Sequence, residues 1–103
     1  MRFLFTASWE VEAGNARAKN DTLGSTVESI ISRLKPEAAY FLADNGKRTA
    51  HLIVNMEDAS QMPAVAEPWF LAFNASVEFK PVMIVEDLVK AGPAIGQAAK
   101  MYG

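Results

Sequence analysis

The side chains best suited to chemistry in this 103-residue chain are His51, its only histidine, and Tyr40. Histidine has an ordinary pKa near neutrality, so it can take up or release a proton at physiological pH. His51 could act as a general base or proton shuttle in a half-buried pocket, with Tyr40 assisting from the next strand. The alternative is a structural histidine that hydrogen-bonds within a subunit interface. We name His51 and Tyr40 as the candidate catalytic residues.

A β-hairpin places these two residues side by side. Asn45-Gly46 lies between two runs of strand-forming residues. This dipeptide supplies the two positive φ angles that a two-residue type I′ turn requires. With Asn45 and Gly46 as the loop, Tyr40 is the cross-strand partner of His51. A slip of one residue would send one of the two side chains to the other face.

Two further groups of residues could bind a ligand. Trp9 and Glu10 end the first predicted strand, where an indole wall beside a carboxylate would suit a small aromatic molecule. Alternatively, Trp9 anchors the helix layer and Glu10 is solvated. Arg48 beside Lys47 could bind an anion, or the two cations could simply flank the turn in solvent.

A third aromatic group, Trp69, Phe70 and Phe73, surrounds a helix that contains Pro68. These rings could line a pocket or fill the core. Metal and cofactor sites are not expected. The chain has no cysteine, and no histidine lies at ligand spacing from the adjacent carboxylates Glu57 and Asp58.

Composition narrows the partners and the compartment. The formal net charge of −2 has no basic excess, which argues against nucleic acid and anionic membranes. No apolar run approaches the roughly 20 residues of a membrane span. No basic, apolar and small-residue sequence of a secretion signal precedes the first strand. We therefore expect a cytoplasmic protein, and a chain of this length predicts one domain, residues 1–103.

The chain pattern predicts the order β-α-β-β-α-β-α. Strands are expected over 2–11, on both sides of the Asn45-Gly46 turn, and over 77–85. An apolar stripe of helical spacing predicts one helix over 15–34, with Gly24 allowing a close approach to the sheet. A second helix starts near residues 58–61, with Ser60 preferred as its cap, and Pro68 should kink or split it. A last helix begins at residue 86 and is broken at Gly92-Pro93, before a tail of small residues.

This order predicts an α+β, ferredoxin-like fold with an extra C-terminal helix. Its four-stranded antiparallel sheet has the strand order 4-1-3-2, with two main helices on one face. Pro81 cannot donate a ladder hydrogen bond, which agrees with the edge position of the fourth strand. Alternation along the strands predicts a face under the helices that carries Phe3, Phe5, Phe41, Ala43, Ala50, Leu52, Val54, Met56, Val77 and Phe79.

The opposite face mixes polar and aliphatic side chains: Leu4, Thr6, Ser8, Tyr40, Leu42, Thr49, His51, Ile53, Asn55, Glu78, Lys80, Val82 and Ile84. The helices cannot cover these residues, because they are committed to the other face. A subunit interface or a barrel lumen fits this mixture. We therefore expect a homodimer.

The aromatic first strand directly after Met1, and the segment 69–74 leading into 77–82, resemble the small dimeric α/β-barrel proteins near the muconolactone-isomerase-like members. The resemblance implies a dimer whose two sheets pack face to face, and it transfers no active-site residue. Two functions follow. The protein could bind or convert a small cyclic or aromatic molecule, as an isomerase or cofactor-free oxygenase would. Alternatively, it is a non-catalytic dimeric module that binds a ligand or a protein.

Overall fold

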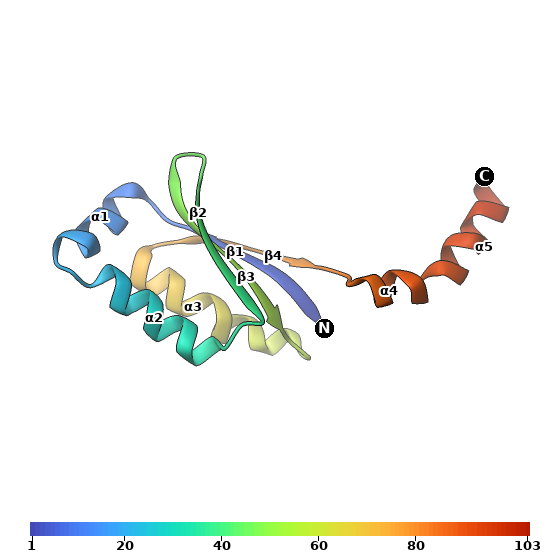
Figure 1. The fold of residues 1–103 in the computed structure, drawn as a ribbon, viewed down its shortest axis with the longest axis horizontal. Coiled ribbons are helices and arrows are strands. Elements are labelled where there is room, and N and C mark those ends of the chain that lie inside the picture. The colour runs from blue at the N-terminus through green and yellow to red at the C-terminus, as the bar shows by residue number, and fades with distance from the viewer.

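The computed structural model describes residues 1–103. The elements in chain order (Figure 1) are β1 (Arg2–Ser8), α1 (Val11–Lys19), α2 (Leu23–Leu34), β2 (Ala38–Asp44), β3 (Lys47–Asn55), the 3₁₀ turn η1 (Ala59–Gln61), α3 (Met62–Phe73), β4 (Ser76–Pro81), α4 (Val85–Lys90) and α5 (Gly92–Tyr102).

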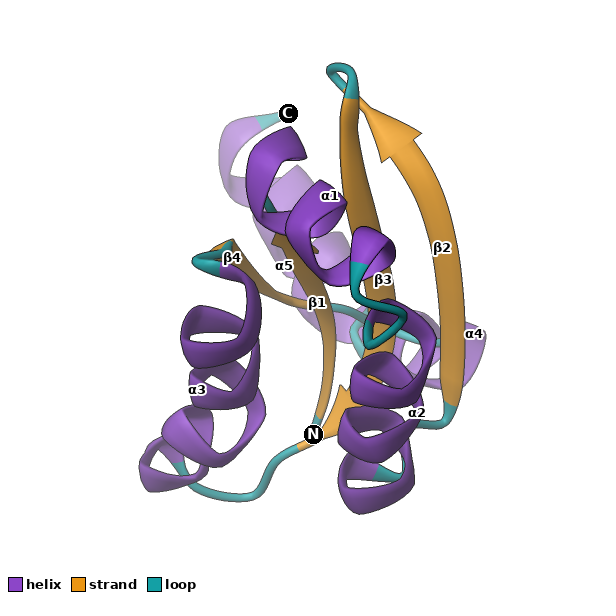
Figure 2. Cartoon of the chain, turned by 90° about the vertical axis from the view of Figure 1, so that its left-hand side faces the viewer, coloured by secondary structure: helices purple, strands orange, loops and turns teal.

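The four strands form one antiparallel sheet in the order β2-β3-β1-β4, which is the predicted 4-1-3-2 order read from the other edge. The α+β class and the edge position of β4, with Pro81 near its end, are confirmed. Helices α1, α2 and α3 cover one face (Figure 2). We call the other face of the sheet the open face. The sheet of a single chain is not closed into a barrel.

The predicted helix over residues 15–34 is wrong, because the structure divides it into α1 and α2. Asp21 has φ 62° in the turn between them, a left-handed conformation that Asp and Asn tolerate better than most residues. The hydroxyl of Thr22 donates to Oδ1 of Asn20 at 2.6 Å and further fixes the turn. The first strand also ends at Ser8, and α1 begins at Val11.

Of the predicted kink or split at Pro68, the split is absent, because α3 runs continuously from Met62 to Phe73. Proline removes one helical hydrogen bond, which the carbonyl of Ala64 would otherwise accept. Ala64 is exposed, so solvent can satisfy that carbonyl. Pro63 lies in the first turn, as predicted.

The cap before α3 is formed by Asp58 and not by Ser60. Asp58 Oδ1 accepts a hydrogen bond from the Ser60 amide at 2.9 Å, and Gln61 Oε1 accepts one from the Asp58 amide at 3.3 Å. The hydrogen bonds from Ser60 lower the pKa of the Asp58 carboxyl below its ordinary value of 3.8.

This cap predicts a pH effect on stability. Because the folded-state pKa of Asp58 is depressed, its contribution is present above the unfolded-state pKa and is lost as the pH falls through the folded-state pKa. Asp58→Ala should therefore lower the thermal midpoint at neutral pH. The difference between the midpoints of the variant and the wild type should shrink as the pH falls into strong acid. Thermal unfolding measured between pH 7 and pH 2 checks this. A difference that is independent of pH would contradict it.

The core lies between the sheet and α1–α3. Its largest completely buried side chains are Phe5, Leu52, Trp69 and Phe73. The prediction that Phe41 and Ala43 lie under the helices is wrong, because both are exposed, Phe41 by 53%. The reason is that the turn end of the β2–β3 hairpin projects beyond the helix layer (Figure 1).

Residues 82–103 form what we call the C-terminal arm, which extends on the side of the sheet away from α1–α3 (Figures 1 and 2). Val82 and Ile84, expected on the open face of a longer fourth strand, belong to this arm. The expected small-residue tail is helical, with Pro93 in the first turn of α5. No residue of α4 or α5 is buried. The radius of gyration is 17.3 Å, against about 13 Å for a compact chain of about 100 residues.

Candidate functional site

The register between Tyr40 and His51 is confirmed, since the two residues are direct partners in the β2–β3 ladder. The same row continues across the sheet, because His51 opposes Thr6 on β1 and Thr6 opposes Glu78 on β4. His51 is half-buried, whereas Tyr40 is 67% exposed. Neither side chain is held by a hydrogen bond.

His51 lines a hollow of about 350 Å³ on the open face. One of the nine lining residues is apolar; the set is Leu4, Thr6, Ser8, Asp44, Asn45, His51, Ser76, Glu78 and Lys80. Glu78 and Lys80 form an ion pair at 3.5 Å within it. Tyr40 is not part of this lining. The structure thus brings His51 together with Thr6 and Glu78, and the catalytic role of His51 and Tyr40 remains a prediction.

A second hollow lies on the helix-covered side of the same hairpin, and we call it the aromatic pocket. It is an open hollow of about 370 Å³ between the residue after β1, the start of α2 and the β2–β3 hairpin. Its lining residues are Trp9, Leu23, Gly24, Val27, Glu28, Phe41, Leu42, Arg48 and Thr49. The volume is sufficient for a ligand with one or two rings.

Trp9 forms a rigid wall of this pocket. Its ring stacks on Phe73 with centroids 4.6 Å apart and lies 5.8 Å from the ring of Trp69. Behind the stack, Arg17 lies over Phe73 at 5.4 Å and donates to the carbonyl of Ala72 at 2.7 Å. Such a stack fixes the orientation of Trp9 without help from a ligand. Trp69 and Phe73 fill the core.

The β1–β3 pairing brings Arg48 to Trp9. The Trp9 amide donates to the Arg48 carbonyl at 3.2 Å, which extends the ladder by one residue. The Arg48 side chain then crosses Gly14 of α1. A Cβ on Gly14 would lie 2.5 Å from Nη1 of Arg48 and 3.0 Å from Nε1 of Trp9. Glycine at position 14 therefore permits the close approach of α1 to both side chains.

We predicted possible ligand contacts at Trp9 with Glu10 and at Arg48 with Lys47. The structure pairs Glu10 with Lys47 instead, at 2.9 Å, which leaves Trp9 and Arg48 as neighbours. Phe41 was missed as a pocket residue because it was assigned to the core. Gly24 was singled out in the sequence because it could allow α2 to approach the sheet closely, and this reason is wrong. A Cβ there would meet no atom within 4 Å, so Gly24 borders the pocket without allowing close packing.

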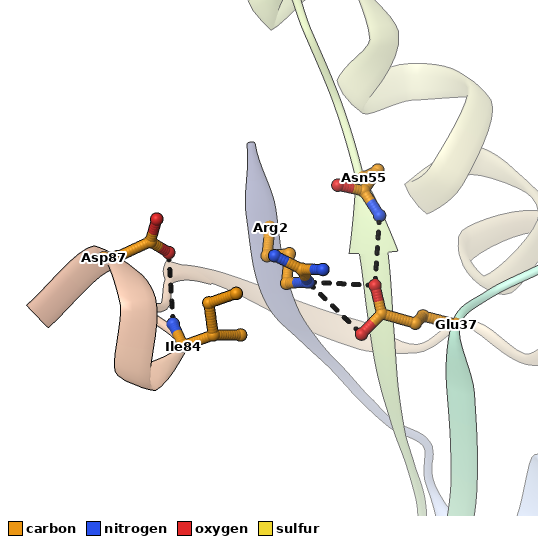
Figure 3. Close-up of polar contacts among 5 residues, drawn as sticks. All are labelled: Arg2, Glu37, Asn55, Ile84 and Asp87. Carbon is orange, nitrogen blue, oxygen red and sulfur yellow. Dashed lines mark hydrogen bonds and ion pairs between the residues drawn. The ribbon is translucent and has the colours of Figure 1, made fainter.

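A third hollow, of about 530 Å³, lies where the C-terminal arm leaves the sheet. Its one cationic side chain, Arg2, is paired with Glu37, with Nε at 2.9 and 3.2 Å from the two carboxylate oxygens (Figure 3). Asn55 donates to the same carboxylate at 3.4 Å, and the Ile84 amide donates to Asp87 at 3.1 Å to begin α4. The arm itself is joined to the sheet by the Val82 amide, which donates to the Arg2 carbonyl at 3.1 Å.

Two further observations bear on the class of protein. No group of three or more His, Asp or Glu side chains could hold a metal ion. None of the helices combines the length and apolar character needed to cross a bilayer.

The chain is thus an α+β protein of the ferredoxin-like type, with an aromatic pocket on one side of its hairpin and a polar hollow on the other. Residues 1–96 match a protein family described as Domain of unknown function (DUF3303), and the chain belongs to that family. A search among curated proteins finds no match.

Proposed function

We propose that the protein binds a small cyclic or aromatic molecule in the aromatic pocket. The observation that carries this proposal is the pairing of a rigid indole wall, Trp9, with a second aromatic wall, Phe41, around about 370 Å³. Phe41 is 53% exposed without a ligand, and a ring placed against it would remove apolar area from water. The hollow around His51, with one apolar residue in its lining, offers much less to an aromatic ring.

Truncation of Phe41 tests this proposal. We expect 1-naphthamide, a neutral bicyclic probe, to bind saturably, and Phe41→Ala to weaken its binding about tenfold through lost ring contact. Because Phe41 is half-exposed, the substitution should change stability little. Chemical shifts of backbone amides in the ¹H–¹⁵N NMR spectrum provide the measurement.

Tyr40→Ala is the matched control for this experiment. It removes an exposed aromatic ring from the neighbouring position of β2, on the opposite face. Its affinity for the probe should equal that of the wild type. Equal weakening by both substitutions, or no saturable shift near Trp9 and Val27, would contradict the proposed pocket.

The proposal includes a homodimer in which a second copy covers the open face. Two observations support it. The open face leaves apolar residues partly exposed, among them Leu4, Leu42 and Ile53. The C-terminal arm carries seven large apolar residues that are exposed: Met83, Val85, Leu88, Val89, Ile95, Met101 and Tyr102. Exposed apolar area of this extent is typical of an interaction surface. The resemblance to dimeric α/β-barrel proteins agrees with it.

Conversion of a small cyclic molecule in the separate hollow at His51, of the isomerase or cofactor-free oxygenase type, is the second candidate function. It is favoured by the hollow of about 350 Å³ at His51, which a second sheet would cap. His51→Ala should then abolish turnover of an identified substrate while the dimer mass in light scattering is unchanged. Loss of the dimer instead would assign His51 a structural role. Retained turnover would exclude a catalytic role for His51, whereas a wild type without turnover would leave the non-catalytic binding module.

A further inference from the structure

Arg48 is the one cation that lines the aromatic pocket, and no carboxylate neutralises it. Its nearest acceptor is the carbonyl of Val11, at the long distance of 3.4 Å from Nη1. The adjacent cation, Lys47, is paired with Glu10 at 2.9 Å. A guanidinium offers several N–H donors in one plane. Most of the N–H groups of Arg48 therefore have no hydrogen-bond acceptor in the protein.

A second donor without a partner lies beside it. Trp9 is only 3% exposed, and its buried Nε1 has no hydrogen-bond acceptor. The two groups meet at Gly14, where an added Cβ would contact both. Buried donors are nearly always satisfied in proteins, so an unsatisfied one at a pocket requires an explanation. These two neighbouring donors have between them one weak acceptor, the Val11 carbonyl, which indicates a place for a further acceptor.

We infer that the ligand of the aromatic pocket is a cyclic or aromatic carboxylate. Its ring lies between Trp9 and Phe41, and its carboxylate accepts from the Arg48 guanidinium at the end where Nε1 of Trp9 lacks an acceptor. Planar, bidentate recognition of a carboxylate is the interaction that arginine makes best. This inference rests on the proposed function, since it specifies the chemistry of the same pocket.

Glu28 refines the ligand class. It is an exposed residue of the α2 wall and forms no ion pair with Arg48. Its carboxylate repels a second negative charge on the ligand and can accept a hydrogen bond from a hydroxyl group. The pocket therefore favours a monocarboxylate over a dicarboxylate.

A pair of matched probes tests the inference. 1-Naphthoate and 1-naphthamide have nearly the same shape, and only the first carries a charge. We expect the wild type to bind 1-naphthoate at least about tenfold more tightly, the difference expected for one charge-assisted hydrogen bond. The indole N–H signals of the ¹⁵N-labelled protein provide a second readout, because the chain has two tryptophans. 1-Naphthoate should shift the Trp9 signal more than that of Trp69, and Trp69→Phe assigns the two peaks.

Variants of the two neighbouring cations complete the test. Arg48→Gln should remove the preference for 1-naphthoate while binding of 1-naphthamide is retained, and Arg48→Lys should leave a partial preference. Lys47→Gln, which removes an adjacent cation outside the pocket, should keep the full preference. A well-dispersed amide spectrum confirms that each variant is folded. If Arg48→Gln does not fold, Arg48→Lys alone tests the role of the guanidinium.

The outcomes separate this inference from the proposed function. Equal affinity for both probes in the wild type, with dependence on Phe41, overturns the carboxylate inference and leaves the pocket. A preference that survives Arg48→Gln, or one that is undiminished in Arg48→Lys, also overturns it. Binding of neither probe near Trp9 overturns both proposals.

Discussion

Trp69→Ala is expected to lower the free energy of unfolding by about 3–5 kcal/mol, the usual range for truncating a buried aromatic residue. Trp69 is completely buried, and its ring lies 6.3 Å from Phe5 and 6.1 Å from Phe73. Removing it leaves a cavity at the point where β1 and α3 meet. A loss of this size is a large part of the total stability of a small domain. Chemical denaturation followed by far-ultraviolet circular dichroism measures it.

Trp69→Phe is the control that separates volume from polarity. Phenylalanine keeps an aromatic ring and also removes an indole N–H that is buried without an acceptor. An unsatisfied buried donor costs about 1–3 kcal/mol, which offsets part of the lost packing. We therefore expect Trp69→Phe to cost much less than Trp69→Ala. Similar losses for the two variants would show that ring packing at Trp69 is not the main contribution.

Ile53→Glu is expected to dissociate the proposed dimer. Ile53 lies on the central strand β3, on the open face, between Ala38 of β2 and Leu4 of β1. In a single chain the new carboxylate remains hydrated, so the fold should persist. Between two packed sheets it would be buried without a partner, which should raise the dimer dissociation constant by at least about 100-fold. Light scattering at micromolar protein concentration should change from the dimer mass to the monomer mass.

Two comparisons make this result specific. Ile53→Val keeps an apolar side chain and should preserve the dimer. Val89→Glu, on α4, tests whether the C-terminal arm contributes to the same contact. A monomer mass for the wild type at micromolar concentration would contradict the proposed dimer directly.

The parts of the fold that the sequence predicts correctly depend on local chemistry with few alternatives. Asn45-Gly46 fixes the hairpin register because few dipeptides provide two positive φ angles. Pro81 marks an edge strand because it lacks an N–H. The division between α1 and α2 escaped prediction, because it depends on the left-handed conformation of Asp21, which many aspartates do not adopt. The last predicted helix corresponds to α4, which begins at Val85, and the predicted break lies before Gly92. Helix α5 escaped prediction, because its small residues were read as an irregular tail.

Single residues of the candidate site could be predicted from the sequence, but their arrangement could not. Trp9 and Arg48 were each recognised as a possible ligand contact, but with the wrong neighbour. Their proximity depends on the β1–β3 register, which no turn specifies, since α1, α2 and β2 separate the two strands in the chain. Sequence alternation does place His51 and Tyr40 on one face, because a two-residue turn determines their pairing. Local pairing can thus be predicted from the sequence, and distant pairing requires the structure.

The stacking of Trp9 on Trp69 has a consequence for spectroscopy of this protein. With ring centroids 5.8 Å apart, the two indoles act as one coupled chromophore, and they are the only tryptophans in the chain. All tryptophan fluorescence therefore originates at one point beside the aromatic pocket. It should respond when that pocket is filled and should be insensitive to events at the distant C-terminal arm. The exciton coupling of the two rings should also add a signal to the far-ultraviolet circular dichroism spectrum that is unrelated to helix content.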